Sequence, residues 1–124
     1  MRLFHGTTKK AFDQIIVDQA ILPDASEGGI VLVKSNIQKP KRGYVYLTDD
    51  YDTAEWYARG INNHTGRNDG VVILEVEIDE SLILPDSVEY SGDDGVDSLK
   101  ETSQCRVKGK IPYSNVVEAI ILYE

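Results

Sequence analysis

The sequence predicts a single α+β domain over residues 1–124, in which a helix-containing half precedes a strand-rich half. Length is the first observation, since 124 residues are enough for one compact domain and too few for two. The second is the order of periodic segments, which lacks the regular strand–helix alternation of a Rossmann fold. The third is the lack of a G-x-G-x-x-G motif and of a Walker lysine loop.

The first two expected elements are a strand and a helix. Residues 3–5 are mainly apolar, and Gly6 favours a turn after them. Thr7 or Thr8 can then cap a helix, because a threonine hydroxyl accepts hydrogen bonds from the free N–H groups of a first turn. Pro23 is expected to end this part of the chain. The apolar residues that share one face of the expected helix are Ala11, Phe12, Ile15 and Ile16.

The middle of the chain combines a long segment of weak periodicity, a strand and a second helix. So long a loop as residues 24–43 is unusual in a small domain and is more often functional than accidental. Residues 44–47 are rich in β-forming residues, and their two tyrosines share one face. Asp49 or Asp50 can cap the helix expected over residues 53–58.

The second half of the chain is expected to consist mainly of strands. The clearest strand covers residues 71–78, where apolar residues alternate with two glutamates towards the end. Residues 62–70 and 91–103 are polar and are expected to form turns and loops. Further strands are expected at residues 106–107 and 116–122.

Composition and charge limit the class of protein. No apolar run approaches the ~20 residues that a membrane helix needs, and the N-terminus does not look like a secretory signal. The single Cys105 cannot form an internal disulfide or a zinc site, and the acidic residues at 93–97 lack the ligand spacing of an EF-hand. We therefore expect a cytoplasmic protein with no metal and no membrane partner, acting in the host cytoplasm if it is phage-encoded.

The net charge of −8 argues against a protein that coats nucleic acid through its overall field. Residues 31–45 nevertheless carry four basic side chains and no acidic one. This segment is either a solvated loop or a local basic lip that meets the phosphates of a dinucleotide or of a nucleic acid. The four basic residues are Lys34, Lys39, Lys41 and Arg42.

Individual residues allow two interpretations. His5 is either a satisfied core histidine or a ligand-binding group, and Gly6 beside it allows a ligand to approach the backbone closely. The aromatic residues near one end of the expected sheet either belong to the core or clamp a flat ring. They are Tyr44, Tyr46, Trp56 and Tyr57.

The order and spacing of several motifs resemble the ADP-ribosyltransferase superfamily of the His-Tyr-Glu class, including small DarT-like phage or bacterial enzymes. The resemblance spans nearly the whole chain and implies a split mixed β-sheet core with a few short helices. It also implies NAD as co-substrate. The segments that carry it are 3–7, the helix that follows, 45–49, 53–58, 71–78, 84–86, 107–112 and 116–122.

The resemblance implies catalytic roles for His5, Tyr46 and Gln104. His5 would bind the hydroxyls of the ribose on the adenosine side of NAD, and Tyr46 would enclose the nicotinamide ring together with Tyr57. The remaining NAD-binding positions that it implies are Gly6 through its backbone, Thr7, Thr53 near the nicotinamide amide, and Lys41 and Arg42 near the pyrophosphate.

Gln104 departs from the family pattern, because the catalytic glutamate of the active family falls at this position when the chain is aligned on residues 107–112. A glutamine can bind a ribose hydroxyl but supplies no negative charge, and loss of one such contact typically costs about 10²–10³ in rate. Three explanations stay open: Glu101 takes the role through a three-residue shift, which would reverse the strand's faces; the substitution is engineered; or the protein is a natural binder or a very slow enzyme.

The leading functional expectation is an NAD-dependent mono-ADP-ribosyltransferase whose acceptor is DNA, RNA, a protein or a small molecule. Such an enzyme would act in toxin or phage–host conflict and could have an antitoxin or immunity partner. The alternative is a binding module of the same fold that holds NAD or a related nucleotide. An RNA 2′-phosphotransferase is less favoured, because that family depends on several arginines and this chain has five.

Overall fold

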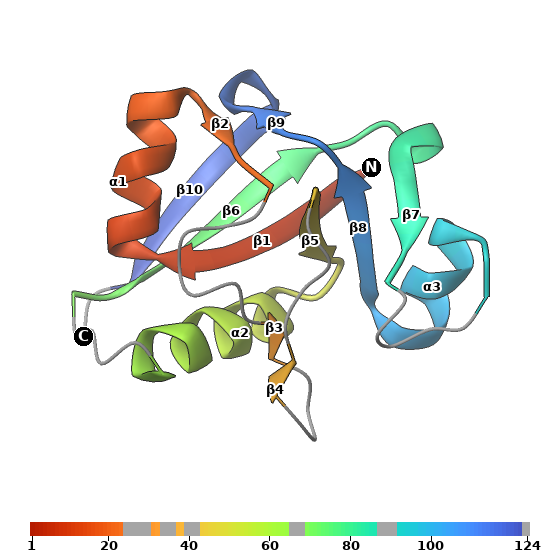
Figure 1. Cartoon of the computed structure of the whole chain (residues 1–124), viewed down its shortest axis with the longest axis horizontal. Helices are drawn as coiled ribbons and strands as arrows, with labels where there is room; N and C mark the ends of the chain where they lie inside the picture. The colour runs from red at the N-terminus through yellow and green to blue at the C-terminus, as the bar shows by residue number, and fades with distance from the viewer. Residues whose placement is uncertain (24–30, 33–36, 39–42, 65–68, 87–91, 123–124) are drawn as a thin grey trace.

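The computed structural model describes residues 1–23, 31–32, 37–38, 43–64, 69–86 and 92–122 (Figure 1). The elements are, in order, β1 (Arg2–Thr8), α1 (Lys9–Asp18), β2 (Ala20–Ile21), β3 (Val31–Leu32), β4 (Ile37–Gln38), β5 (Tyr44–Thr48), α2 (Tyr51–His64), β6 (Val71–Glu77), the 3₁₀ turn η1 (Glu80–Leu82), β7 (Ile83–Pro85), α3 (Gly95–Thr102), β8 (Gln104–Lys108), β9 (Ile111–Pro112), η2 (Tyr113–Asn115) and β10 (Val116–Leu122). Helices that pack on one main antiparallel sheet confirm the α+β class.

The main sheet has six strands in the order β10-β6-β1-β5-β8-β7. Strand β1 pairs with β6 along its whole length, but it meets β5 at one pair only, Phe4 with Thr48. Strand β5 instead pairs with β8 over five positions. The sheet therefore consists of two three-stranded halves that are joined at a single backbone pair.

Every strand pair among the described residues is antiparallel, so the prediction of a mixed sheet is wrong. Strands β5 and β6 do run in the same direction and are connected by α2, the arrangement that would place parallel strands side by side. Strand β1 lies between them and pairs with both in the opposite direction. Insertion of this earlier strand removes the parallel pair.

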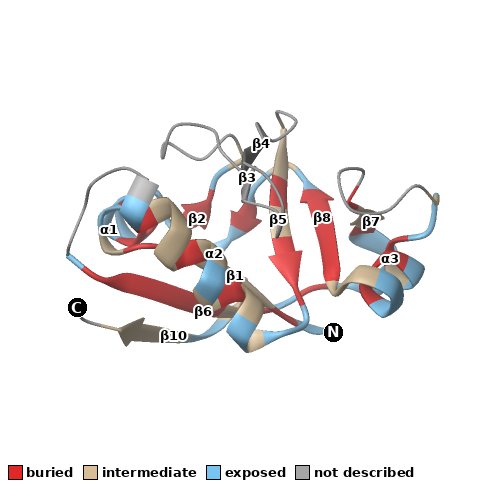
Figure 2. Ribbon diagram, turned by 90° about the horizontal axis from the view of Figure 1, so that it is seen from below, coloured by how far each residue is buried: buried red, intermediate tan, exposed pale blue. Residues whose placement is uncertain are grey.

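Two apolar clusters cover opposite faces of the sheet, because successive residues of a strand point to opposite sides. On one face, Phe12 and Ile15 of α1 pack with Leu3 and Leu74. On the other, a second cluster contains Ala54 and Ala58 of α2 with Val71 and Ile73 of β6. Figure 2 shows the buried residues along β1, β5 and β8 and the exposed ones on the outer faces of the helices.

The start of the chain follows the expected order with two differences. Thr8 caps α1, since its hydroxyl accepts from Ala11 N at 3.1 Å. Gly6, however, does not end the strand but lies within β1, opposite Ile73. A Cβ at Gly6 would lie 2.0 Å from the carbonyl oxygen of Ala54 in α2, so glycine is explained here by helix packing. Ile16, expected on the buried face, is 39% exposed.

Two segments expected to be loops are partly helical. Helix α2 continues to His64, and residues 95–102 form α3. The side chain of Asp94 caps α3 by accepting from the backbone N–H groups of Val96 and Asp97. The apolar periodicity of α3 is too weak to predict a helix, because Leu99 is its only large buried side chain. Helix α3 packs against β7 and β8 at one end of the sheet (Figure 1).

The long segment at 24–43 contains the paired strands β3 and β4, which the weak periodicity did not predict. Strand β9 pairs with β2, and so connects the region near Pro112 to the end of α1. No helix in the described part of the chain is long and apolar enough to cross a membrane.

Candidate functional site

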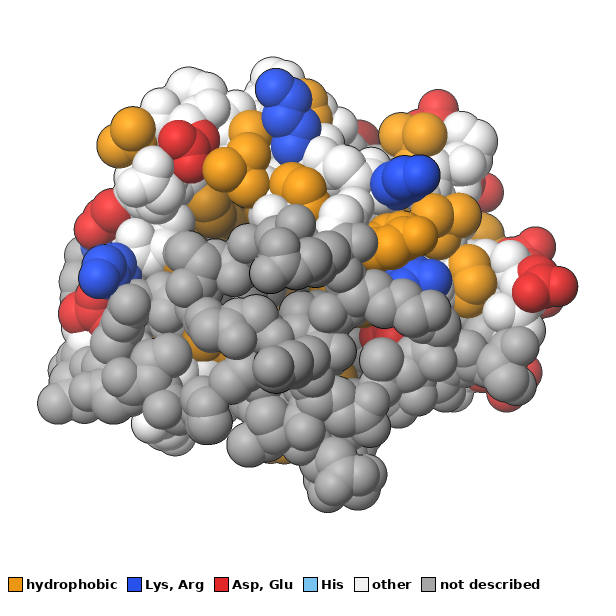
Figure 3. Space-filling view, in the orientation of Figure 1, with side chains coloured by type: hydrophobic (Ala, Val, Ile, Leu, Met, Phe, Trp, Pro, Cys, Tyr) orange, Lys and Arg blue, Asp and Glu red, His pale blue; other side chains and the backbone are white. Residues whose placement is uncertain are grey.

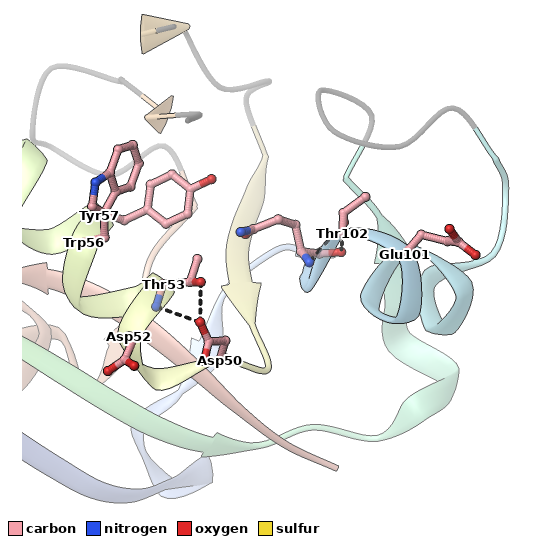
Figure 4. A pocket seen from close by; sticks show the side chains of 8 residues that line it. Asp50, Asp52, Thr53, Trp56, Tyr57, Glu101 and Thr102 are labelled. Atoms are coloured by element: carbon pink, nitrogen blue, oxygen red, sulfur yellow. Dashed lines mark hydrogen bonds between the residues drawn. The ribbon is translucent and has the colours of Figure 1, made fainter. Parts of the chain in front are cut away.

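A cavity of about 550 Å³ lies between α2 and the junction of α3 with β8 (Figure 4). Its volume falls within the roughly 300–1,000 Å³ that is usual for small-molecule sites. Three of the predicted site residues line it, namely Thr53, Tyr57 and Gln104. The other lining residues are Asp50, Asp52, Trp56, Glu101 and Thr102.

The α2 side of the cavity is fixed by the start of the helix. Asp50 accepts a hydrogen bond from Thr53 N at 3.1 Å, as expected of a capping aspartate, and the Thr53 hydroxyl donates to the same carboxylate oxygen. The hydroxyl of Thr53 therefore keeps its lone pairs for a ligand N–H group. One turn further along, Trp56 and Tyr57 meet edge to face with ring centroids 5.2 Å apart.

The β8 side of the cavity is held through the backbone of Gln104. The hydroxyl of Ser98 donates to the carbonyl oxygen of Gln104 at 2.7 Å, and Gln104 N donates to the hydroxyl of Thr102 at 3.1 Å. Gln104 is 7% exposed, yet its side-chain amide forms no hydrogen bond to any described residue. Because Gln104 lines the cavity, its amide can donate to or accept from a ligand there without losing a bond within the protein.

His5 bridges the two half-sheets where they diverge. Its Nδ1 lies 3.0 Å from the backbone oxygen of Tyr46. A carbonyl oxygen can only accept, so Nδ1 carries the proton of this hydrogen bond. Burial lowers the pKa of His5 below 6.5, against a smaller opposing effect of the Tyr46 carbonyl. The neutral ring then presents Nε2 as an acceptor, which suits a hydroxyl donor.

The other predicted residues are not part of the described lining of the cavity. Gly6 packs under α2, Thr7 is buried in β1, and Tyr46 lies in the middle of β5 opposite Arg106. Lys41 and Arg42 fall outside the described residues.

The structure separates the two candidates for the carboxylate position. Gln104 is the first residue of β8, whereas Glu101 is an exposed residue of α3. Figure 4 shows the carboxylate of Glu101 directed away from Thr53 and Tyr57. A three-residue shift would therefore move the expected carboxylate position from strand β8 into helix α3.

Arg106 was missed from the sequence. It is 8% exposed, its guanidinium carbon lies 4.1 Å from the ring centre of Tyr44, and its Nε and Nη1 have no hydrogen-bond partner among the described residues. The sequence feature that could have pointed to Arg106 is its place between two apolar residues of a strand, Cys105 and Val107. The lining residues Asp50 and Thr102 were not predicted to bind a ligand either.

The charged residues in the described lining of the cavity are all acidic. They are Asp50, Asp52 and Glu101. On the face seen in Figure 3, hydrophobic side chains extend from α1 across to β8, and acidic ones lie mainly towards the edges. Among the described residues, no group of three His, Cys, Asp or Glu side chains is placed to hold a metal ion.

No protein-family model and no curated protein matches the chain.

Proposed function

We propose that the chain has an ADP-ribosyltransferase-like fold, binds NAD and transfers ADP-ribose from it to a nucleic acid or protein acceptor. The observation that carries this proposal is the convergence of Thr53, Tyr57 and Gln104 on one cavity. These residues come from two elements that are far apart in the chain, and the motif resemblance had assigned all three to the nicotinamide end of NAD. The split between β1 and β5 supports it further, since His5 and Tyr46 meet there.

In this proposal the nicotinamide ring lies against Tyr57 and Tyr46, and its amide N–H donates to the hydroxyl of Thr53. Nε2 of His5 accepts from a ribose hydroxyl on the adenosine side, which requires the neutral ring that burial favours. The amide oxygen of Gln104 accepts from a hydroxyl of the nicotinamide ribose. The free amide of Gln104 inside the cavity supports this last contact.

The chemistry breaks the bond between nicotinamide and ribose, and the bonding electrons leave with nicotinamide. The ribose carbon becomes cationic in the transition state, and a nucleophile of the acceptor then bonds to it and releases its proton. A fixed anion near the ribose would stabilise that charge, whereas Gln104 offers only a dipole. We therefore expect a transfer rate well below that of a glutamate-bearing site.

A second candidate function is a binding module that holds NAD or a related nucleotide without cleaving it. The neutral amide of Gln104 specifically favours this candidate, because it retains the hydrogen bond and lacks the charge.

The experiment compares the unchanged protein with Gln104→Glu, using Glu101→Gln as the matched control. NAD binding is measured by calorimetry, and nicotinamide release is measured with DNA, RNA or lysate as acceptor. We expect all three proteins to bind NAD, and Gln104→Glu to release nicotinamide about 10²–10³ times faster than the unchanged protein.

The other outcomes separate the alternatives. Loss of nicotinamide release in Glu101→Gln would assign the carboxylate role to Glu101. NAD binding with no release from any variant would favour the binding module. Failure of the unchanged protein and of Gln104→Glu to bind NAD would overturn the proposal.

A further inference from the structure

Arg106 is a buried cation that forms no ion pair with any described residue. The residue is 8% exposed, and its Nε and Nη1 are buried without a hydrogen-bond partner in the part of the chain that the structure describes. The five ion pairs found among the described residues involve other side chains. Burying an unpaired charge is strongly unfavourable, so such a group persists where it has a role in binding.

The position of Arg106 relates it to the cavity. Residues of β8 alternate between two faces, and Cys105 and Val107 point into the apolar core. Arg106 therefore shares its face with Gln104, which lines the cavity, and the two positions are roughly 6.6 Å apart along the strand. Arg106 also pairs directly with Tyr46, whose carbonyl oxygen accepts from His5. Arg106 is thus next to Gln104 at the cavity on this face of the sheet, and its partner Tyr46 is next to the point where β1 and β5 separate.

The surroundings of the guanidinium define what it can bind. The ring of Tyr44 lies 4.1 Å from the guanidinium carbon and covers one face of the group. A ligand must then approach in the plane, where the N–H donors point. A planar set of donors with a fixed positive charge fits the oxygens of a phosphate.

We propose that Arg106 and Tyr44 form the subsite for the diphosphate of the nucleotide. This inference rests on the proposed function, because it takes the cavity at Gln104 as the place of the adjoining ribose. It assigns to β8 a phosphate contact that the sequence had placed in the segment of Lys41 and Arg42.

The test compares the unchanged protein with Arg106→Met, which keeps a long side chain against Tyr44 but removes the charge. Lys108→Met is the matched control, since it removes a charge from the exposed end of the same face. The probes are ADP, inorganic pyrophosphate as a competitor of ADP, and a short oligonucleotide. Binding is measured by calorimetry, and thermal unfolding is measured with and without ADP.

We expect Arg106→Met to bind ADP at least about tenfold more weakly, in line with the loss of a charge-assisted hydrogen bond. Pyrophosphate should compete with ADP in the unchanged protein and no longer do so in Arg106→Met. Without ligand, Arg106→Met should unfold at the same or a higher temperature, because it removes an unpaired buried charge. Lys108→Met should keep most of the affinity for ADP.

Three results would overturn the subsite. The first is equal ADP affinity in Arg106→Met and the unchanged protein, and the second is a clearly lower unfolding temperature of unliganded Arg106→Met. The third is an Arg106→Met variant that binds the oligonucleotide more weakly but binds ADP as well as the unchanged protein does. The first would leave the proposed function standing if nicotinamide is still released. Conversely, ADP binding that depends on Arg106 without nicotinamide release from Gln104→Glu would support the subsite while the transferase proposal fails.

Discussion

Replacing Gly6 by alanine tests the close approach of α2 to β1, on which the position of the cavity depends. The added Cβ would lie 2.0 Å from the carbonyl oxygen and 2.9 Å from the carbonyl carbon of Ala54, and 3.2 Å from Cβ of Ala58. Real Cβ contacts essentially never fall below 3.0 Å, so α2 must retreat by about 1 Å. The obstacle is helix backbone, which no change of rotamer can move.

Overpacking of this kind typically costs about 1–3 kcal/mol, and a rigid neighbour favours the upper end of that range. We therefore expect Gly6→Ala to lower the free energy of unfolding by about 3 kcal/mol and the unfolding temperature by roughly 10 °C. Urea unfolding followed by circular dichroism measures the first quantity, and a thermal scan measures the second. Because α2 carries Thr53 and Tyr57, the NAD binding that we propose should weaken as well.

Gly109→Ala is the matched control. Gly109 has φ +81° and no heavy atom within 4 Å of an added Cβ, so alanine meets backbone strain there but no steric contact. That strain costs about 1–2 kcal/mol. A Gly6→Ala variant that is no less stable than Gly109→Ala would refute the close approach of α2 to β1.

Two further predictions follow from buried titratable groups. Burial lowers the pKa of His5 below its ordinary 6.5, so the unfolded chain takes up this proton more readily than the native protein. The free energy of unfolding should thus fall as pH drops below about 6.5. Urea unfolding at about pH 7.5 and about pH 5.5 measures this fall, which should be smaller in His5→Gln than in the unchanged protein. A fall of the same size in His5→Gln would contradict the prediction. Burial also raises the pKa of Cys105 to about 12, so a thiol reagent at about pH 8 should label it only after unfolding, and fast labelling of the native protein would refute its burial.

Elements with a strong local signal were predicted well from the sequence. Strand β6 is a run of apolar residues that alternates with Glu75 and Glu77 towards its end, and β5 consists mainly of β-forming residues. Both patterns can be read without knowledge of the partner strands. Strands β2 and β9 have two residues each and exist only because they pair with one another across more than 80 residues of chain. Helix α3 depends on a single cap and one large buried side chain, Leu99, and so it was assigned to a loop.

For the candidate site, the sequence indicated Thr53, Tyr57 and Gln104 through their motif context, and these residues do line one cavity. Arg106 is different, because its interest lies in being buried without a partner, which is a property of the tertiary structure. The antiparallel sheet is likewise non-local, since it depends on β1 inserting between β5 and β6.

The central place of β1 has a consequence for folding. This strand leaves the ribosome before both of its neighbours, and its main partner β6 begins at Val71. Until β6 has been synthesised, Leu3 and Thr7 cannot be buried as they are in the finished protein, because β1 lacks its main partner strand. The pairing of β1 with β6 then closes a loop of more than 60 residues. Contacts of such long range slow folding and leave strand edges exposed in the meantime. A nascent chain that stops before β6 should therefore be prone to aggregate and should depend on chaperones more than the finished protein does.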